Sequence, residues 1–227
     1  MRIAVLTGAG MSADSGIQTF RGAGGLWEGH RVEDVATPEA WLRDPALVLQ
    51  FYNERRRGVL AAQPNRGHLA LAELAQQHDV HIITQNIDDL HERAGSNKVL
   101  HLHGEIVKAR SERNAGLLVD CRTDLHLGDL ASDGAQLRPH IVWFGEMVPM
   151  MEPAIGIVED ADVILIIGTS MVVYPAASLF QYSKPQAPVF VINPEQPEMS
   201  RSARIQFITQ RAVTGVDHFI QEILPAL

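Results

Sequence analysis

The feature that most constrains the fold of this chain is a series of short runs of β-branched and other apolar residues, each ending in small or polar residues. Such runs are typical of strands that are buried on both faces in a parallel sheet. We expect strands at 2–7, 80–84, 98–102, 140–144, 163–168 and 189–193. Helical patterns lie between them, as at 67–77 and 217–224. The alternation predicts an α/β fold with a doubly wound parallel sheet.

Two stretches interrupt this alternation. Residues 18–64 contain no convincing strand but hold a helical pattern, with Pro45 near a helix start. Residues 106–139 are polar and weakly periodic, which indicates a second insertion or a loose module. We therefore expect one domain over 1–227 with a smaller inserted lobe built from these two stretches. The large lobe is expected at about 1–17, 65–105 and 140–227.

Charge and cysteine content exclude several classes of protein. The net charge is −8 and no long basic run is present, so we expect no nucleic-acid or membrane partner. The single cysteine, Cys121, allows neither an internal disulfide nor a four-cysteine metal site. The first apolar run is too short for a signal sequence, and none reaches the length of a membrane span. These features fit a reducing, cytoplasmic location.

A glycine-rich loop follows the first expected strand. Gly8, Gly10 and Ala13 satisfy the pattern G-x-G-x-x-G/A, which predicts a Rossmann-like site where a helix N-terminus faces a dinucleotide phosphate. A tight turn without a ligand is the alternative. A dehydrogenase is disfavoured, because it needs a second strand ending in an acidic residue about 20 residues on, and no strand is expected before Val80.

Polar residues also gather where the expected strands end, and open parallel sheets bind ligands beyond those ends. The stretches concerned are 8–13, 85–88, 103–104, 143–146, 168–170 and 193–195. A helix cap could explain any one of them, such as Asp88, but not all six together.

Two histidines stand close together after residue 98. A histidine in an apolar run is usually a packed core residue. Because side chains alternate along a strand, His101 and His103 share a face, with His101 one step inside the strand and His103 at its exit. We assign a structural role to His101 and a chemical role to His103.

Six motifs in this order resemble the sirtuin family of NAD-dependent protein-lysine deacylases. They are GAGMSADSGIQTFRGAGGLW, TQNIDDLHERAG, HLHGE, RPHIVWFGE, GTSMVVYPAA and VINPE. The resemblance covers nearly the whole chain and implies a single sirtuin-type catalytic domain. It implies NAD as co-substrate and acylated lysine-containing proteins or peptides as partners, with nicotinamide, free lysine and O-acyl-ADP-ribose as products.

The resemblance also implies residue roles. His103 matches the base that deprotonates a ribose hydroxyl, and the near-neutral pKa of histidine suits this task. Asn86 and Asp88, the other expected catalytic residues, match groups that hold the ribose and the nicotinamide carboxamide. Phe20 and Arg21 match a loop that shields the reactive carbon from water. The other expected cofactor contacts are Gly8, Ala9, Gly10, Ser12, Ala13, Trp27, Gln85, Ile87, Gly168, Thr169, Ser170, Asn193, Pro194, Glu195 and Ala212.

Substrate contacts follow in the same way. Two edges match those that clamp the peptide as an added strand: Val142, Trp143 and Phe144 on one side, and Val172 and Tyr174 on the other.

The acyl pocket resembles that of the branch that removes succinyl and malonyl groups. Ala36 replaces a bulkier residue, and Tyr52 and Arg55 lie three apart on one helix face. A guanidinium and a phenol together can bind a carboxylate. The alternative is a solvated basic run over 55–57. Acetyl groups are expected to enter as well.

The sequence departs from the family between HGE and RPH, where a four-cysteine zinc module is usual. Only Cys121 is present there, and Asp120, Asp124, His126 and Asp129 do not give a zinc-binding spacing. We expect a solvated acidic loop, no structural zinc and no other metal site.

Two alternatives remain besides deacylation. One is an ADP-ribosyltransferase or NAD hydrolase that uses the same pocket. The other is a non-catalytic NAD-sensing module, which the presence of His103, Asn86 and Asp88 argues against. The oligomeric state is left open.

Overall fold

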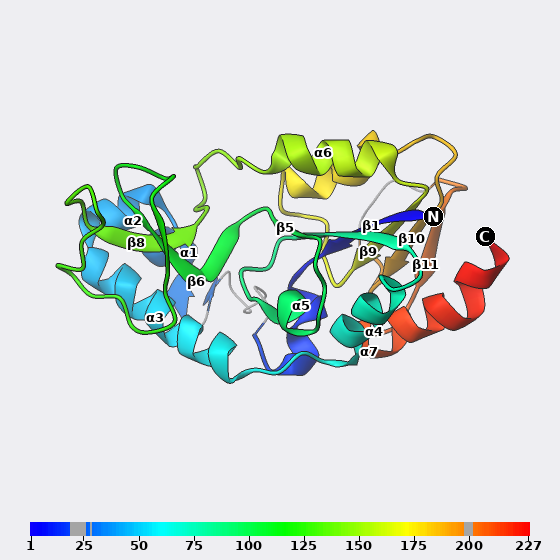
Figure 1. Ribbon diagram of the computed structural model, residues 1–227, viewed down its shortest axis with the longest axis horizontal. Helices are drawn as coiled ribbons and strands as arrows, with labels where there is room; N and C mark the ends of the chain where they lie inside the picture. Colours follow the sequence, from blue (N-terminus) through cyan, green and yellow to red (C-terminus); the bar gives the residue numbers. More distant parts are fainter. Residues whose placement is uncertain (19–25, 28, 198–201) are drawn as a thin grey trace.

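The computed structural model describes residues 1–18, 26–27, 29–197 and 202–227. Figure 1 shows an elongated molecule, with a large lobe around the main sheet at one end and a smaller lobe at the other. Both termini lie at the large-lobe end. Within the described ranges, no helix is long and apolar enough to cross a bilayer.

The main sheet has six strands in the order β11-β10-β9-β1-β4-β5, and every neighbouring pair is parallel. They are β1 (Arg2–Thr7), β4 (Asp79–Thr84), β5 (Val99–His101), β9 (Val163–Ile167), β10 (Val189–Ile192) and β11 (Ile205–Ile208). The chain runs outward from β1 to β5, then returns to the other side of β1 at β9. The strand order therefore reverses beside β1, which is where such sheets bind ligands. The predicted doubly wound α/β fold is confirmed.

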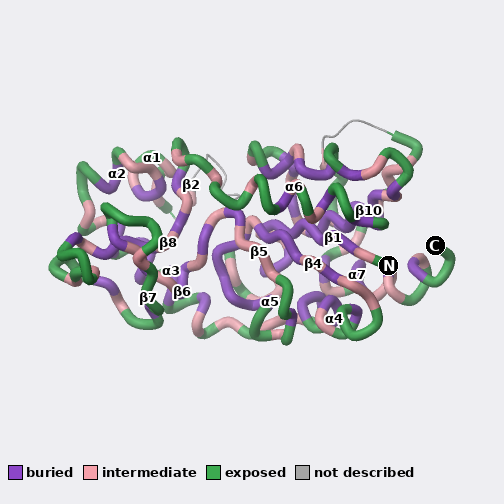
Figure 2. The backbone as a smooth tube through the Cα atoms, turned by 45° about the horizontal axis from the view of Figure 1, so that its top comes forward, coloured by how far each residue is buried: buried purple, intermediate pink, exposed green. Residues whose placement is uncertain are grey.

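Helices cover both faces of this sheet, as Figure 1 shows. On one face α4 (Arg66–Leu74) and α7 (Ala212–His218) pack against alternate strand residues such as Ile3 and Val5. On the other face α6 (Met151–Asp160) and the 3₁₀ helix η3 (Ala176–Tyr182) pack against Ala4 and Leu6. All four of these β1 side chains are almost completely buried, which is why the strand is a continuous apolar run; β1 carries the colour of buried residues in Figure 2.

The remaining elements of the large lobe are short. They are η1 (Ala9–Met11), η2 (Ala13–Ser15), α5 (Leu90–Arg93), the π-helical turn η4 (Phe219–Ile223) and η5 (Leu224–Ala226).

The small lobe combines helices with an antiparallel sheet. Its sheet has the order β7-β6-β8, and a second core fills the space between that sheet and the helices. The elements are β2 (Leu26–Trp27), β3 (His30–Arg31), α1 (Val32–Val35), α2 (Pro38–Arg43), α3 (Pro45–Ala61), β6 (Gly104–Ser111), β7 (Leu118–Asp120) and β8 (Leu137–Ile141). The predicted helix start at Pro45 is confirmed, and the Asp44 side chain accepts a hydrogen bond from Leu47 N–H, capping the helix.

Three strand predictions need correction. The run at 140–144 is not a strand of the parallel sheet; β8 covers 137–141 and pairs with β6 in the small lobe. The edge strand β11 has no counterpart among the predicted strands. The described residues of 18–64 do contain strands, the two-residue β2 and β3, which pair with each other and not with the main sheet. Among these described residues, none forms the dinucleotide-fold strand that a dehydrogenase needs there.

The stretch at 106–139 is better ordered than a loose module. Two α3 side chains hold it: Arg56 Nε donates to Ile106 O (2.8 Å), and Arg56 Nη1 donates to Thr123 O (3.2 Å). Asn53 exchanges two hydrogen bonds with the Leu125 backbone, both 2.9 Å. Arg56 is completely buried. We call Asn53 and Arg56 the α3 clamp.

Candidate active site

A single cavity of about 840 Å³ is lined by residues of both lobes. Its size lies in the range of sites for small molecules and cofactors. Phe20 and Arg21 fall outside the described residues. Every other residue predicted above to bind cofactor or substrate lines this cavity. Residues from the ends of β1, β4, β9 and β10 thus meet residues of α3 and of the segment after β8.

The glycines of the loop after β1 allow it to pack closely against the loop after β9. A Cβ on Gly10 would lie 2.8 Å from Gly168 Cα, and one on Gly8 would lie 2.8 Å from Thr169 Cβ. Gly10 N–H donates to Gly168 O (2.8 Å), so the loops after β1 and β9 touch directly. The α-helix expected after the loop is wrong, because residues 9–15 form the two short 3₁₀ helices η1 and η2.

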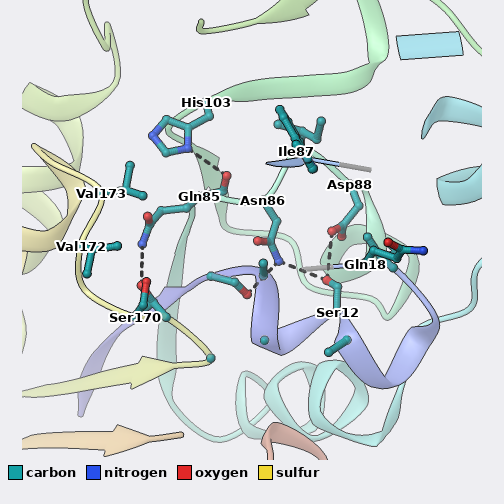
Figure 3. Close-up of a pocket in the computed structure, with 18 of the residues that line it drawn as sticks. Ser12, Gln18, Gln85, Asn86, Ile87, Asp88, His103, Ser170, Val172 and Val173 are labelled. Carbon is teal, nitrogen blue, oxygen red and sulfur yellow. Dashed lines mark hydrogen bonds between the residues drawn. The ribbon is translucent and has the colours of Figure 1, made fainter. Parts of the chain in front are cut away.

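A chain of hydrogen bonds joins the ends of β1 and β4 (Figure 3). The Asn86 amide nitrogen donates to Gly8 O and to Ser12 Oγ, both at 3.1 Å, and Ser12 Oγ donates to Asp88 Oδ2 (2.9 Å). The other Asp88 oxygen accepts from Leu90 N–H (3.2 Å), so Asp88 also serves the turn before α5. Burial raises the pKa of Asp88, although the bonds from Leu90 and Ser12 oppose this.

His103 is held in one tautomer. Its Nδ1 lies 3.0 Å from Gln85 O, and because a carbonyl can only accept, Nδ1 carries the proton (Figure 3). Nε2 is then left unprotonated. Burial lowers the pKa of His103, and the bond to Gln85 only partly offsets it, so the ring is neutral at pH 7. The next residue, Gly104, has φ +81°, and a Cβ there would lie 2.0 Å from His140 O, so only glycine fits.

His101 has a different environment and does not line the cavity. Its Nε2 lies 2.8 Å from Glu92 Oε1, and its Nδ1 lies 3.1 Å from Asn86 O. Burial alone would lower the pKa of His101, but the Glu92 carboxylate raises it overall. His101 therefore supports the backbone that carries Asn86.

The small-lobe end of the cavity is aromatic and basic. Tyr52 and Arg55 are both buried. The Arg55 guanidinium lies 4.3 Å from the centroid of the Trp27 ring, a cation–π distance. Burial raises the pKa of Tyr52, so its hydroxyl stays protonated. Ala36 also lines this part of the cavity, and its small side chain leaves room beside Arg55. Because the guanidinium is positively charged, this end of the cavity can accept an anionic group.

The segment after β8 has its N–H groups in use. Val142 N–H donates to His103 O (2.9 Å), Trp143 N–H to Glu146 Oε2 (2.7 Å), and Phe144 N–H to Ala36 O (3.0 Å). A peptide strand along this edge must therefore donate to its carbonyl groups. The side chains of Val172 and Tyr174, which were expected at the other peptide edge, are largely exposed and also line the cavity.

Several cavity residues were missed by the sequence predictions. Val59 stands four residues after Arg55, so the helical period of α3 is a signal for it. Gln18, Glu146 and Val173 lie inside the recognised motifs. No sequence signal points to Arg211, which pairs with Asp14 at the cavity wall.

No group of three or more metal-ligating side chains forms within the described ranges. The absence of zinc ligands in the small lobe remains a prediction from the cysteine count.

Comparisons with known proteins identify the family. The Sir2 family profile matches residues 8–175. The chain belongs to the Sir2 family. An NAD-dependent protein deacylase of Helicobacter pylori is 50% identical over 225 residues, covering 99% of this chain and 94% of that protein. One from Bacteroides thetaiotaomicron is 51% identical over 230 residues, covering 99% and 98%.

Solved Sir2 structures share the fold. A Sir2 homologue in complex with NAD has a TM-score of 0.87 and 39% identity, covering 99% of this chain and 90% of that one. A Sir2 variant with a deacetylated p53 peptide and 3′-O-acetyl-ADP-ribose has a TM-score of 0.83 and 30% identity, covering 97% and 93%. The α/β fold with a smaller lobe is thus the Sir2 fold.

Proposed function

We propose that this Sir2 family protein is an NAD-dependent protein-lysine deacylase that prefers succinyl and malonyl groups and also removes acetyl groups. Relatives at about half identity bear the deacylase name. The observation that carries the acyl preference is that one cavity is lined both by the strand-end residues and by Tyr52 and Arg55.

The strand-end residues fit NAD chemically. Asn86 uses its amide N–H₂ group within the protein, so its carbonyl oxygen is what it offers a ligand. Asp88 and Glu195 can accept from ribose or carboxamide donors, and Ser170 adds a hydroxyl at the end of β9. NAD would supply the electrophilic ribose carbon and the ribose hydroxyl that attacks the acyl group.

His103 would act as the base. Its Nδ1 proton is held by Gln85 O, so Nε2 is free to accept a proton from a ribose hydroxyl. The lowered pKa of His103 keeps Nε2 available at neutral pH.

Tyr52 and Arg55 would bind the acyl carboxylate. The protonated phenol donates one hydrogen bond, and the guanidinium presents two parallel N–H groups to the two oxygens. Ala36 leaves room for the longer acyl chain.

The test compares succinyl-, acetyl- and unmodified-lysine peptides with NAD, following nicotinamide and freed lysine together. Replacing Arg55 with Met removes a charged partner of a buried carboxylate, so the succinyl-to-acetyl ratio of kcat/KM should fall by about thirtyfold or more. An equal loss on both substrates contradicts the pocket assignment. Nicotinamide release without acyl-lysine favours the NAD hydrolase or ADP-ribosyltransferase alternative.

The lobe limits, the cytoplasmic location and the metal-free small lobe stay predictions.

A further inference from the structure

The Tyr52 hydroxyl accepts a hydrogen bond from a neighbour that was expected to contact only the peptide. Trp143 Nε1 donates to Tyr52 Oη at 3.0 Å, and both side chains are almost completely buried. The described part of the chain offers no acceptor for the Tyr52 hydroxyl proton itself. That proton remains for a ligand in the cavity, which Tyr52 lines.

The geometry of a phenol makes this bond directional. Conjugation with the ring keeps the hydroxyl hydrogen in the ring plane, where the oxygen has two positions, one for the hydrogen and one for an acceptor lone pair. An N–H donor that occupies one position forces the hydrogen into the other. The Trp143 indole therefore decides which way Tyr52 donates.

The indole itself is held firmly. The Arg138 guanidinium carbon lies 3.3 Å from the centroid of the Trp143 ring, and the Trp41 ring packs at 5.9 Å between centroids. Glu146 accepts from Trp143 N–H (2.7 Å) and from Arg138 Nη1 (2.8 Å), which fixes the backbone and the stacked cation together. These contacts leave the indole N–H one direction, toward Tyr52.

We propose that Trp143 is a positioning residue for acyl specificity, which orients the Tyr52 hydroxyl to donate to the carboxylate of a succinyl or malonyl group. This rests on the function proposed above, and it gives the Trp143 side chain a role separate from the peptide edge. An acetyl group has no carboxylate, so this orientation contributes nothing to its binding.

The test is a double-mutant cycle on the succinyl-to-acetyl ratio of kcat/KM. Trp143→Phe keeps a ring in place but removes the N–H, and any damage to the peptide edge affects both substrates and cancels in the ratio. We expect the ratio to fall about three- to tenfold, the range for one lost hydrogen bond, mainly through KM for the succinyl peptide. In a Tyr52→Phe background, the same substitution should leave the ratio unchanged, because the hydroxyl is gone.

Trp41→Phe is the matched control. Trp41→Phe keeps a ring packed against the indole and removes only an N–H that donates elsewhere, to Glu112 Oε2 (3.3 Å), so it should leave the ratio unchanged. An equal fall in both Tyr52 backgrounds, or no fall with Trp143→Phe alone, overturns the role of Trp143. The wild-type ratio tests the proposed function separately. A wild-type enzyme without succinyl preference overturns the proposed acyl preference and the role of Trp143 together. A succinyl preference that Trp143→Phe leaves intact overturns only the role of Trp143.

Discussion

The α3 clamp gives a sharp prediction about what orders the small lobe. Replacing Arg56 with Met keeps an unbranched apolar side chain of similar length but removes three hydrogen bonds. These run to Ile106 O, Thr123 O and Asn53 Oδ1, the last at 2.6 Å. The two backbone carbonyls are left in the lobe interior without this donor.

The magnitude follows from these contacts. Hydrogen bonds from a charged donor contribute about 1.5–3 kcal/mol each. The cost of burying the guanidinium, whose Nη2 has no partner within the described residues, offsets part of that sum. We expect the unfolding free energy to fall by about 3 kcal/mol, and Tm to fall by roughly 6–12 °C in a domain of this size. Urea unfolding and calorimetry measure both quantities.

Arg57→Met is the matched control. Arg57 is the next residue on α3, but it is exposed and pairs with Asp124 at the surface, so its removal should change stability by at most about 1 kcal/mol. If Arg56→Met destabilises the protein no more than Arg57→Met, the clamp does not order this lobe.

Three further predictions follow from the site and its surroundings. Replacing His103 with Ala should lower kcat for peptide deacylation by roughly 10²–10⁴-fold while nicotinamide exchange persists, and equal loss of both would place His103 outside the base role. Because burial lowers the pKa of His103 and Nε2 must be unprotonated to act, the acidic limb of the kcat/KM profile should lie below pH 6.5, and a limb above that value contradicts the neutral base. Burial also lowers the pKa of His68 to about 4, so on acidification the unfolded chain takes up a proton at a higher pH than the folded protein does. The free energy of unfolding should therefore fall by up to about 3 kcal/mol between pH 6.5 and 4. Urea unfolding of a His68→Gln variant should show a weaker dependence of this free energy on pH.

Much of the large lobe is predictable because its strands are buried on both faces. Continuous apolar runs mark β1, β4, β9 and β10, and the polar residues after them mark the edge where the cavity lies. β11 is not predicted from the sequence because Gln206 interrupts its short apolar pattern at the sheet edge, where one side is solvated.

The run at 140–144 shows what apolar character alone cannot predict. Ile141 and Trp143 are buried, as expected, but in the small-lobe core, because β8 pairs with β6. Strand propensity and burial are the same in either sheet, and only long-range pairing decides between them.

The basic run at 55–57 carries a similar lesson. Arg57 alone is solvated; Arg55 lines the cavity, and Arg56 is completely buried in the clamp. Helical spacing separates their faces, but the two backbone carbonyls that accept from Arg56 belong to residues fifty or more positions away, which no local pattern reveals.

The most direct test of the central claim, that one cavity couples NAD cleavage to lysine deacylation, is the stoichiometry of the two products. With NAD and a succinyl-lysine peptide, we expect one nicotinamide for each freed lysine, and only background nicotinamide when the peptide carries unmodified lysine. Nicotinamide released at the same rate with or without the acyl group would contradict the account.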